Sequence, residues 1–492
     1  MNGKSPNVPK TRKIKLPTAD AISARMESIG EPKLAITSFL LQYRQFTEGH
    51  AGQISRNAII PLVNLPEADR FGPFANRGVK ALPKTVVIRL NGGLGTSMGL
   101  ERAKSLLPAK GDLTFLDIAI GQVIRLRKTV NCDLPFVLMN SFNTNKDTMA
   151  VVNWYPGLEA GQKKIPVAFL QHKVPKIRQS DLQPVDWPED RSLEWCPPGH
   201  GDLYLALVTS GMLERFLEGG LEYAFVSNVD NLGATVDLSI LGYFAEKKLP
   251  FLMEVTDRTE ADRKGGHIAR DRHGRLILRE LAQCPEGDED DFQDIAKYRF
   301  FNTNNLWINL KALRSALKKH HNLLQLPPIV NRKTVDPTDA ASPAVFQLET
   351  AMGAAIAVFP GAEAVRVPRT RFAPVKTTED LLALWSDAYV LTDDMHINLA
   401  PSRHGRPPVL RLDPMYYGTY NLLKARFPYE PPSLAQCESL SIKGDIKFGQ
   451  KVIFRGRVEI RNSRPGQMAV PDNAEIVGEG YSPDYSEWMR GQ

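Results

Sequence analysis

Short apolar segments alternate with amphipathic ones through the middle of this 492-residue chain, and this alternation constrains the fold more than any other feature. Each short segment has the length and the β-favouring composition of a buried strand. The predicted strands are residues 85–90, 135–139, 165–170, 223–227 and 251–255, and helices predicted at 113–127 and 203–217 lie between several of them. Strands that alternate with helices indicate an α/β fold with a mostly parallel mixed sheet, in which ligands bind beyond the carboxyl ends of the strands.

We expect four regions: a flexible arm (1–20), a helical and loop region (21–84), the α/β domain (85–400) and a β-rich C-terminal domain (401–492). Further helices are predicted at 21–49, 347–358 and 378–391. In the C-terminal domain, β-favouring pairs are separated by Gly or Asn, which is typical of a β-solenoid such as a left-handed β-helix. An antiparallel β cap is the alternative.

Charge and cysteine content argue against several classes of function. The net charge of +7 is mild, and basic residues are interleaved with acidic ones, which does not favour nucleic-acid binding. The basic residues of the N-terminal arm fit a solvated tail better than a binding site. The four scattered cysteines form no CxxC pair, which indicates a reducing compartment and argues against a zinc site. No segment resembles a signal core or a membrane span, so we expect a soluble, cytoplasmic protein with no membrane partner.

A glycine-rich turn at residues 90–99 directly follows the first predicted strand of the α/β domain. Its glycine spacing matches neither a P-loop nor a dinucleotide-binding fingerprint. Gly92, Gly93 and Gly95 nevertheless leave backbone N–H groups open to an anion such as a phosphate. Tight packing of a strand against a helix would also require glycines, but Lys104 follows closely and could place an ammonium beside a bound phosphate. The turn and Lys104 together predict a phosphate site with a candidate catalytic cation.

These residues belong to a longer pattern. Residues 90–98, followed by Lys104 and Ser105, closely resemble the UTP–glucose-1-phosphate uridylyltransferase family of eukaryotes and some bacteria. Further blocks resemble the same family in the same order: residues 171–177, 195–202, 227–233, 264–266, 280–283, 301–307, 347–350 and 371–378. Because the blocks span about residues 85–390, the resemblance is far more specific than one loop.

The resemblance implies a Rossmann-like nucleotidyltransferase domain that converts UTP and glucose 1-phosphate to UDP-glucose and pyrophosphate, reversibly and with Mg²⁺ as cofactor. It implies nucleotide contacts from Leu90, Asn91, Gly92, Gly93, Gly95, Thr96, Gln171, Gly199 and Gly201. It implies sugar-phosphate contacts from His200, Asn228, Gly265, Gly266, Glu280, Asn304 and Asn305. Lys104 and Lys376 are then the catalytic cations, and Asp230 is the Mg²⁺ ligand.

These roles suit the residue types. The amide of Gln171 can satisfy the alternating donors and acceptors of a uracil edge, and Asp230 offers the hard oxygen that Mg²⁺ prefers. Ammonium groups reduce the repulsion between two polyanions, and an ionised phosphate nucleophile needs no general base. Simpler interpretations remain open, because an Asp after a strand is often a helix cap and a loop lysine is often only solvated.

Four residues depart from the family pattern: Leu100, the adjacent Arg102 and Ala103, and His267. A related uridylyltransferase that uses another sugar phosphate, such as galactose 1-phosphate, is the first alternative function. A non-catalytic nucleotide-sugar sensor or scaffold is the second, and the presence of both Lys104 and Asp230 argues against it. Self-association into a homo-oligomer through residues 401–492 is the protein partnership that this architecture would allow.

Overall fold

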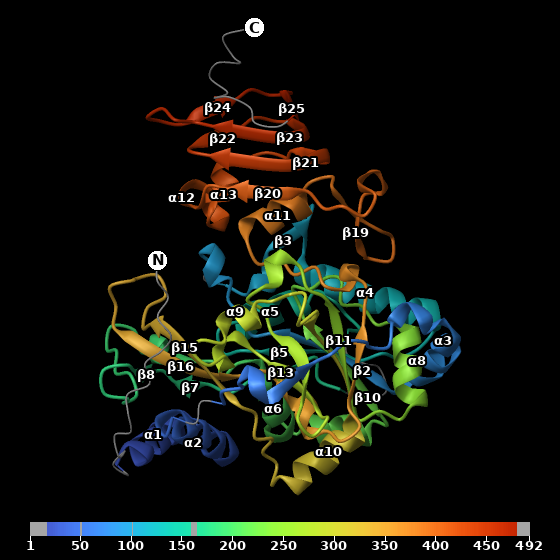
Figure 1. Ribbon diagram of the computed structural model, residues 1–492, viewed down its shortest axis with the longest axis vertical. Coiled ribbons are helices and arrows are strands. Elements are labelled where there is room, and N and C mark those ends of the chain that lie inside the picture. Colours follow the sequence, from blue (N-terminus) through green and yellow to red (C-terminus); the bar gives the residue numbers. More distant parts are fainter. Residues whose placement is uncertain (1–16, 50–51, 101, 159–164, 480–492) are drawn as a thin grey trace. The chain divides into compact units, whose positions relative to one another are not determined.

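The chain folds into two compact units, which the computed structural model describes for residues 17–49, 52–100, 102–158 and 165–479 (Figure 1). Within the described ranges, the first unit contains residues 17–92, 127–228 and 234–372, and the second contains residues 93–126, 229–233 and 373–479. The boundary expected after residue 400 therefore lies inside the second unit. Residues 1–16 of the expected arm lie outside the described residues, and residues 17–20 begin helix α1 (Pro17–Ser28).

A ten-stranded mixed sheet forms the centre of the first unit within the described ranges. Its strands are β1 (Ile59–Pro61), β2 (Thr85–Asn91), β5 (Phe136–Asn140), β6 (Ala168–Leu170), β10 (Tyr223–Asn228), β11 (Phe251–Asp257), β12 (His267–Asp271), β13 (Leu276–Arg279), β14 (Phe300–Asn309) and β17 (Glu363–Arg366). Strands β6, β5, β2 and β10 are neighbours in that order and pair in parallel, whereas β14 pairs antiparallel with β10 and β11. The predicted mixed α/β fold is confirmed, and all five predicted strands belong to this sheet.

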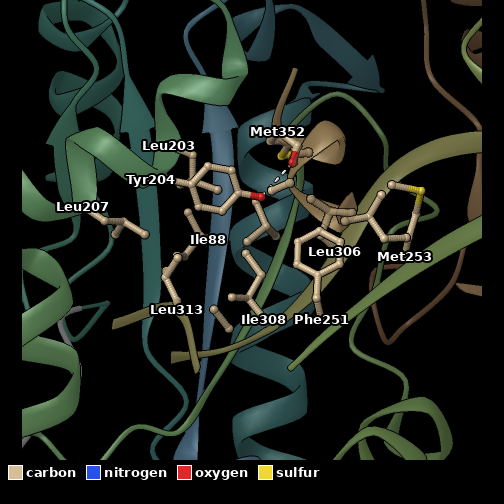
Figure 2. Close-up of a cluster of buried hydrophobic side chains, with 14 of the residues drawn as sticks. Ile88, Leu203, Tyr204, Leu207, Phe251, Met253, Leu306, Ile308, Leu313 and Met352 are labelled. Carbon is tan, nitrogen blue, oxygen red and sulfur yellow. Dashed lines mark hydrogen bonds between the residues drawn. The ribbon is translucent and has the colours of Figure 1, made fainter. Parts of the chain in front are cut away.

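The helices of the first unit include α2 (Lys33–Thr47), α3 (Ala75–Ala81), α5 (Asn145–Val152), α6 (Leu203–Thr209), α7 (Met212–Glu218), α8 (Leu238–Glu246), α9 (Glu289–Phe292) and α10 (Leu310–Lys319). Figure 2 shows how α6 and α10 contribute to the core: Leu203, Leu207 and Leu313 belong to one buried cluster with Ile88 of β2 and Phe251 of β11. Each such side chain contributes about 1.5–3 kcal/mol when fully buried. The core therefore holds the strand ends, and the loops that follow them, in fixed positions.

The prediction of a helix over residues 347–358 is wrong. Residues Ala344–Thr350 form strand β16, which pairs antiparallel with β15 (Pro328–Thr334) and β8 (Ile177–Arg178), and a 3₁₀ helix follows at Met352–Val358. Strand formation depends on partners from distant parts of the chain, which a local pattern does not reveal. A further short pair, β7 (Val174–Pro175) with β9 (Trp195–Cys196), lies between β6 and α6 in the sequence.

Other predicted helices have different bounds. The helix predicted at 203–217 is divided into α6 and α7 at Gly211, whose φ of +73° is not helical. The helix predicted at 21–49 is divided into α1 and α2 just before Lys33, where Pro32 is extended. The helix predicted at 378–391 ends early as α11 (Thr378–Trp385), and β18 (Tyr389–Leu391) then pairs with β19 (Ile397–Leu399).

Parallel strands dominate the C-terminal part of the second unit. Strands β20 (Val409–Leu412), β21 (Ser433–Lys443), β23 (Ile453–Arg461) and β25 (Glu475–Glu479) pair in parallel in that order, as do β22 (Ile446–Phe448) and β24 (Met468–Val470). Figure 1 shows these strands as stacked layers. The alternative of an antiparallel cap is therefore wrong.

The second unit also contains the hairpin β3 (Pro108–Lys110) and β4 (Leu113–Thr114), helix α4 (Phe115–Val130), and the short helices α12 (Pro414–Tyr417) and α13 (Tyr420–Arg426). One buried cluster joins Met98, Leu107 and Phe115 to C-terminal residues such as Leu412 and Leu440. This shared core is the reason why the chain does not divide after residue 400.

Two further observations concern cysteines and membranes. Cys132, Cys196, Cys284 and Cys437 are free thiols. In the described ranges, no helix combines the length and the apolar composition that a membrane crossing requires.

Candidate functional site

Several predicted site residues lie along one edge of the large sheet, at the carboxyl ends of its parallel strands. Asn91 is the register partner of Asn140, and Leu90 is the partner of Asn228. Gln171 directly follows β6, and its backbone N–H donates to the carbonyl of Asn140 at 2.9 Å. Because ligands of α/β sheets bind beyond such strand ends, the fold brings these residues to the expected place. Leu90 itself is buried, so its side chain serves the core.

Gly92 and Gln171 lie in direct contact. A Cβ atom added to Gly92 would lie only 2.3 Å from Nε2 of Gln171, so no other residue fits at position 92 without moving the amide. Two hydroxyl groups fix the backbone here: Ser141 Oγ donates to the carbonyl of Gly92 at 2.8 Å, and Thr144 Oγ1 donates to that of Asn91 at 2.7 Å. Both hydroxyls are fully buried, and the sequence did not identify them as part of the site.

The side chain of Asn91 is also buried. Its Nδ2 donates to Asn140 Oδ1 at 2.8 Å and to Thr148 Oγ1 at 2.9 Å. Asn91 therefore anchors the start of the glycine-rich turn to β5 and α5 through its side chain. The two hydrogen bonds that Nδ2 donates hold the start of the turn in place, which suits a loop that must present its backbone to a ligand.

The turn at residues 199–201 packs closely against the end of β16. Gly199 has φ +80°, and an added Cβ would lie 2.6 Å from the carbonyl oxygen of Thr350. A Cβ on Gly201 would lie 2.4 Å from Thr350 Oγ1. The backbone N–H of Met352 donates to Nδ1 of His200 at 3.0 Å, and burial lowers the pKa of His200 to about 4. His200 is therefore neutral near pH 7 and carries its proton on Nε2.

The glycines predicted to contact a sugar lie beside Glu280. A Cβ on Gly266 would lie 2.4 Å from a carboxylate oxygen of Glu280, and one on Gly265 would lie 2.0 Å from the ring of Phe301. The turn before them is held by Arg258, whose Nη2 donates to the carbonyls of residues 262, 263 and 265 at 3.1, 2.5 and 3.4 Å. Arg258 was not identified from the sequence, because its role depends on contacts that form only in the fold.

The two adjacent asparagines of β14 have different environments. Asn304 is partly exposed and has φ +59°, next to an irregularity in the pairing of β14 with β11. Such local strain is common at functional sites. Asn305 is fully buried, and its amide donates to the carboxylate of Glu254 at 3.0 Å. The same carboxylate forms an ion pair with Arg371. The structure therefore places Asn305 in the scaffold and Asn304 at the surface of the strand.

In the second unit, the loop that contains the remaining glycines folds back on itself. Leu94 forms a bridge with Ala103, and the backbone N–H of Lys104 donates to the carbonyl of Gly93 at 3.3 Å. Lys104 Nζ lies 2.5 Å from Oδ2 of Asp230, and each side chain is only 17% exposed. The predicted cation and the predicted metal ligand are therefore brought together as a partly buried ion pair.

The other residues of this loop differ in exposure. Gly95 is buried, and an added Cβ would lie 2.2 Å from Leu100 Cδ1. Gly93 and Thr96 are exposed. Gly95 is therefore required for packing against Leu100, whereas Gly93 and Thr96 are open to solvent.

Lys376 is exposed and lies two residues before the start of α11. The carboxylate of Asp380 accepts from the backbone N–H of Lys376 at 2.8 Å. The segment just before it touches the loop of Asp230, since Pro374 forms a bridge with Asn231 and Asn231 Oδ1 accepts from the backbone of residue 373 at 3.0 Å. Asp230 and Lys376 thus belong to neighbouring segments.

Known proteins are similar to this chain in sequence and in fold. A family model described as UTP--glucose-1-phosphate uridylyltransferase matches residues 36–455. Proteins of that name from Solanum tuberosum and Saccharomyces cerevisiae are 40% and 41% identical over 401 and 397 residues, which cover 81% and 80% of this chain and 81% and 77% of the relatives. A solved structure of a variant UDP-glucose pyrophosphorylase from Leishmania major, in complex with UDP-glucose, has 44% identity and a TM-score of 0.88 over 96% of this chain and 100% of that chain.

Proposed function

Because this chain belongs to the UTP–glucose-1-phosphate uridylyltransferase family, we propose that it converts UTP and glucose 1-phosphate to UDP-glucose and pyrophosphate, reversibly. The observation that carries the proposal is the row of Gln171, Asn91 and Asn228 at the carboxyl ends of neighbouring parallel strands. The complex of the Leishmania major protein with UDP-glucose supports this class of ligand for the fold.

We propose that the uracil is recognised by the amide of Gln171 and the turn at residues 199–201. The close packing of Gln171 against Gly92 holds the amide in one place, and packing against Thr350 does the same for the turn. An amide and exposed backbone can match the alternating donors and acceptors of a uracil edge. A base with another pattern would leave buried polar groups without partners, which is costly.

The sugar phosphate is assigned to a second group of residues: His200, Asn228, Gly265, Gly266, Glu280 and Asn304. The contact of Gly266 with the carboxylate of Glu280 supports this, because small residues beside a carboxylate leave room for sugar hydroxyls. Asn305, which the resemblance also suggested, is assigned instead to the support of Asn304, since its amide is occupied by Glu254.

We assign the stabilisation of charge to Lys104 and Lys376, with the glycine-rich turn as the phosphate cradle. Two unit charges about 4 Å apart interact by about 4 kcal/mol at an effective dielectric constant of about 20. This is about three powers of ten in rate. The phosphate of glucose 1-phosphate is already ionised, so its oxygen attacks the α-phosphorus of UTP directly and no general base is required.

Mg²⁺ is the cofactor that we propose, with Asp230 as its ligand. Within the described ranges, no group of three or more His, Cys, Asp or Glu side chains could hold a metal ion. Mg²⁺ is usually held by one or two carboxylates together with substrate phosphates and water, so a single partly buried carboxylate fits. Bound Mg²⁺ supplies positive charge to the phosphates. Lys104 balances the charge of Asp230 through their ion pair.

We further propose that the stacked parallel strands from β20 to β25 form a left-handed β-helix through which copies of the chain associate. The parallel pairing of β20, β21, β23 and β25 supports the solenoid. Light scattering of the purified chain measures its mass in solution, and a monomer at all concentrations would refute the association. The cytoplasmic location stays a prediction.

The test of the reaction uses the full chain with UTP, glucose 1-phosphate and Mg²⁺. We expect UDP-glucose and pyrophosphate in equal amounts, with little product from galactose 1-phosphate or from CTP. Faster turnover with another sugar phosphate would favour the alternative uridylyltransferase. Binding of UDP-glucose without any turnover would favour the sensor or scaffold.

A further inference from the structure

A buried imidazole–carboxylate pair, His172 and Asp202, is formed by residues that are next in sequence to those assigned to the uracil. Oδ2 of Asp202 accepts from the backbone N–H of His172 at 2.8 Å, and ring Nδ1 of His172 lies 2.9 and 3.0 Å from the two carboxylate oxygens. Both residues are 6% exposed. His172 follows Gln171 in the chain and Asp202 follows Gly201, so the pair joins the two segments of the nucleobase site.

The opposite side of the ring is also fixed. Nε2 of His172 lies 2.9 Å from Oγ1 of Thr209, and that hydroxyl donates to the carbonyl of Leu205 at 3.1 Å. The hydroxyl can therefore accept from Nε2, so the surroundings of the ring can satisfy a proton on each nitrogen. Burial lowers the pKa of His172, but the hydrogen bond and charge of Asp202 and the charge of Glu31 outweigh it, so the pKa is raised. The fold therefore makes protonation of His172 easier than it is for a free imidazole.

We propose that His172 and Asp202 are positioning residues that set the spacing between the amide of Gln171 and the turn at residues 199–201. Neither side chain touches the substrate in this proposal, which rests on the proposed function. The pair connects the segment just after β6 to the residue just before α6. A change in this spacing weakens uridine recognition, because hydrogen bonds to a base depend on the relative positions of their donors and acceptors.

The test compares His172→Phe, which removes both ring contacts, with His172→Asn, whose amide can still donate to Asp202. For His172→Phe we expect the KM for UTP to rise by about 10- to 100-fold. The KM for glucose 1-phosphate should rise by a smaller factor, because His200 alone among the residues assigned to the sugar phosphate lies in the turn at residues 199–201. The preference for UTP over CTP should fall. His172→Asn should recover most of both losses. Tyr243→Phe serves as the control, because it removes a partly buried hydrogen bond, to Glu363, outside the proposed site.

Equal rises in both KM values, or an unchanged KM for UTP and unchanged base preference, would overturn the proposal. Calorimetric titration with UTP measures the same effect without turnover, so the pair is tested even if the wild-type chain forms no product. If His172→Phe does not fold, the same comparison is made with Asp202→Asn, and wild-type UTP affinity in that variant would overturn the proposal. If the wild-type chain forms product and neither variant changes the KM for UTP or the base preference, the positioning role is refuted while the proposed function stands.

Discussion

The contact between Gly92 and Gln171 predicts a large effect from the smallest possible side chain. In Gly92→Ala, the new Cβ would lie 2.3 Å from Nε2 of Gln171, 3.0 Å from its Cδ and 3.2 Å from its Oε1. Carbon atoms in contact normally lie about 3.5–4.0 Å from their neighbours, so the amide must move by about 1 Å or more. The φ angle of residue 92 is not positive, so alanine causes no backbone strain there and the clash with Gln171 is the only expected cause of an effect.

Displacement of the amide should cost its hydrogen bonds to the uracil. If two bonds are lost, at about 1–1.5 kcal/mol each, the loss is about 2–3 kcal/mol. This corresponds to a decrease of about 30- to 150-fold in kcat/KM for UTP, with weaker preference for UTP over CTP. Steady-state kinetics with varied nucleotide measure both quantities. Gly72→Ala is the matched control, because a Cβ there meets nothing within 4 Å. Wild-type kcat/KM and base preference in Gly92→Ala would refute the reasoning.

Three further predictions follow from other parts of the structure. Lys104→Met should lower kcat by about 10²- to 10³-fold with little change in UTP affinity. The control Lys128→Met, at an exposed position of α4, should leave kcat unchanged. A kcat of Lys104→Met within about threefold of wild type would remove Lys104 from the mechanism. The pKa of His200 falls from 6.5 to about 4 on folding, so the unfolded chain takes up a proton first as the pH is lowered, and the free energy of unfolding should fall between pH 6.5 and pH 4. Urea titrations at pH 7 and pH 5 should show a smaller fall in this free energy for His200→Asn than for the wild type. An equal fall would contradict the assignment of the effect to His200. Truncation after residue 400 should expose Met98, Leu107 and Phe115 and reduce both the melting temperature and the activity, whereas a stable, active fragment would contradict the shared core.

The strand pattern and the ordered motifs predicted the central sheet and most positions at its carboxyl edge. They did so because both signals are local: a buried strand needs a short apolar run, and the glycine-rich turn directly follows such a run. Gln171 and Asn228 could be placed for the same reason, since each comes at or just after the end of a parallel strand.

Residues that act through distant contacts could not be found in this way. Ser141, Arg258 and the pair of His172 and Asp202 look ordinary in the sequence, and their roles appear only when loops from separate strands meet. The sequence could not distinguish the environments of Asn304 and Asn305, because the difference arises in the fold, where Asn305 is fully buried and Asn304 is partly exposed.

The strand β16 and the contribution of residues 93–126 to the second unit were not predicted, for a related physical reason. The segment of residues 93–126 contributes to the core of the C-terminal strands, although about 300 residues separate them, and no local composition marks that contact. His267, which departs from the family pattern, is fully buried and stacks 4.1 Å from the ring of Tyr298. The residue that differs from the family pattern therefore packs in the interior, next in sequence to Gly266.

The central claim is that the phosphate of the sugar attacks the α-phosphorus of UTP directly, without a covalent intermediate on the protein. The stereochemical course at that phosphorus, measured with a UTP analogue in which sulfur makes the α-phosphorus chiral, tests it most directly. A single in-line displacement predicts inversion of configuration in the UDP-glucose product. Retention would require two displacements through a nucleotidylated side chain, and would contradict the account.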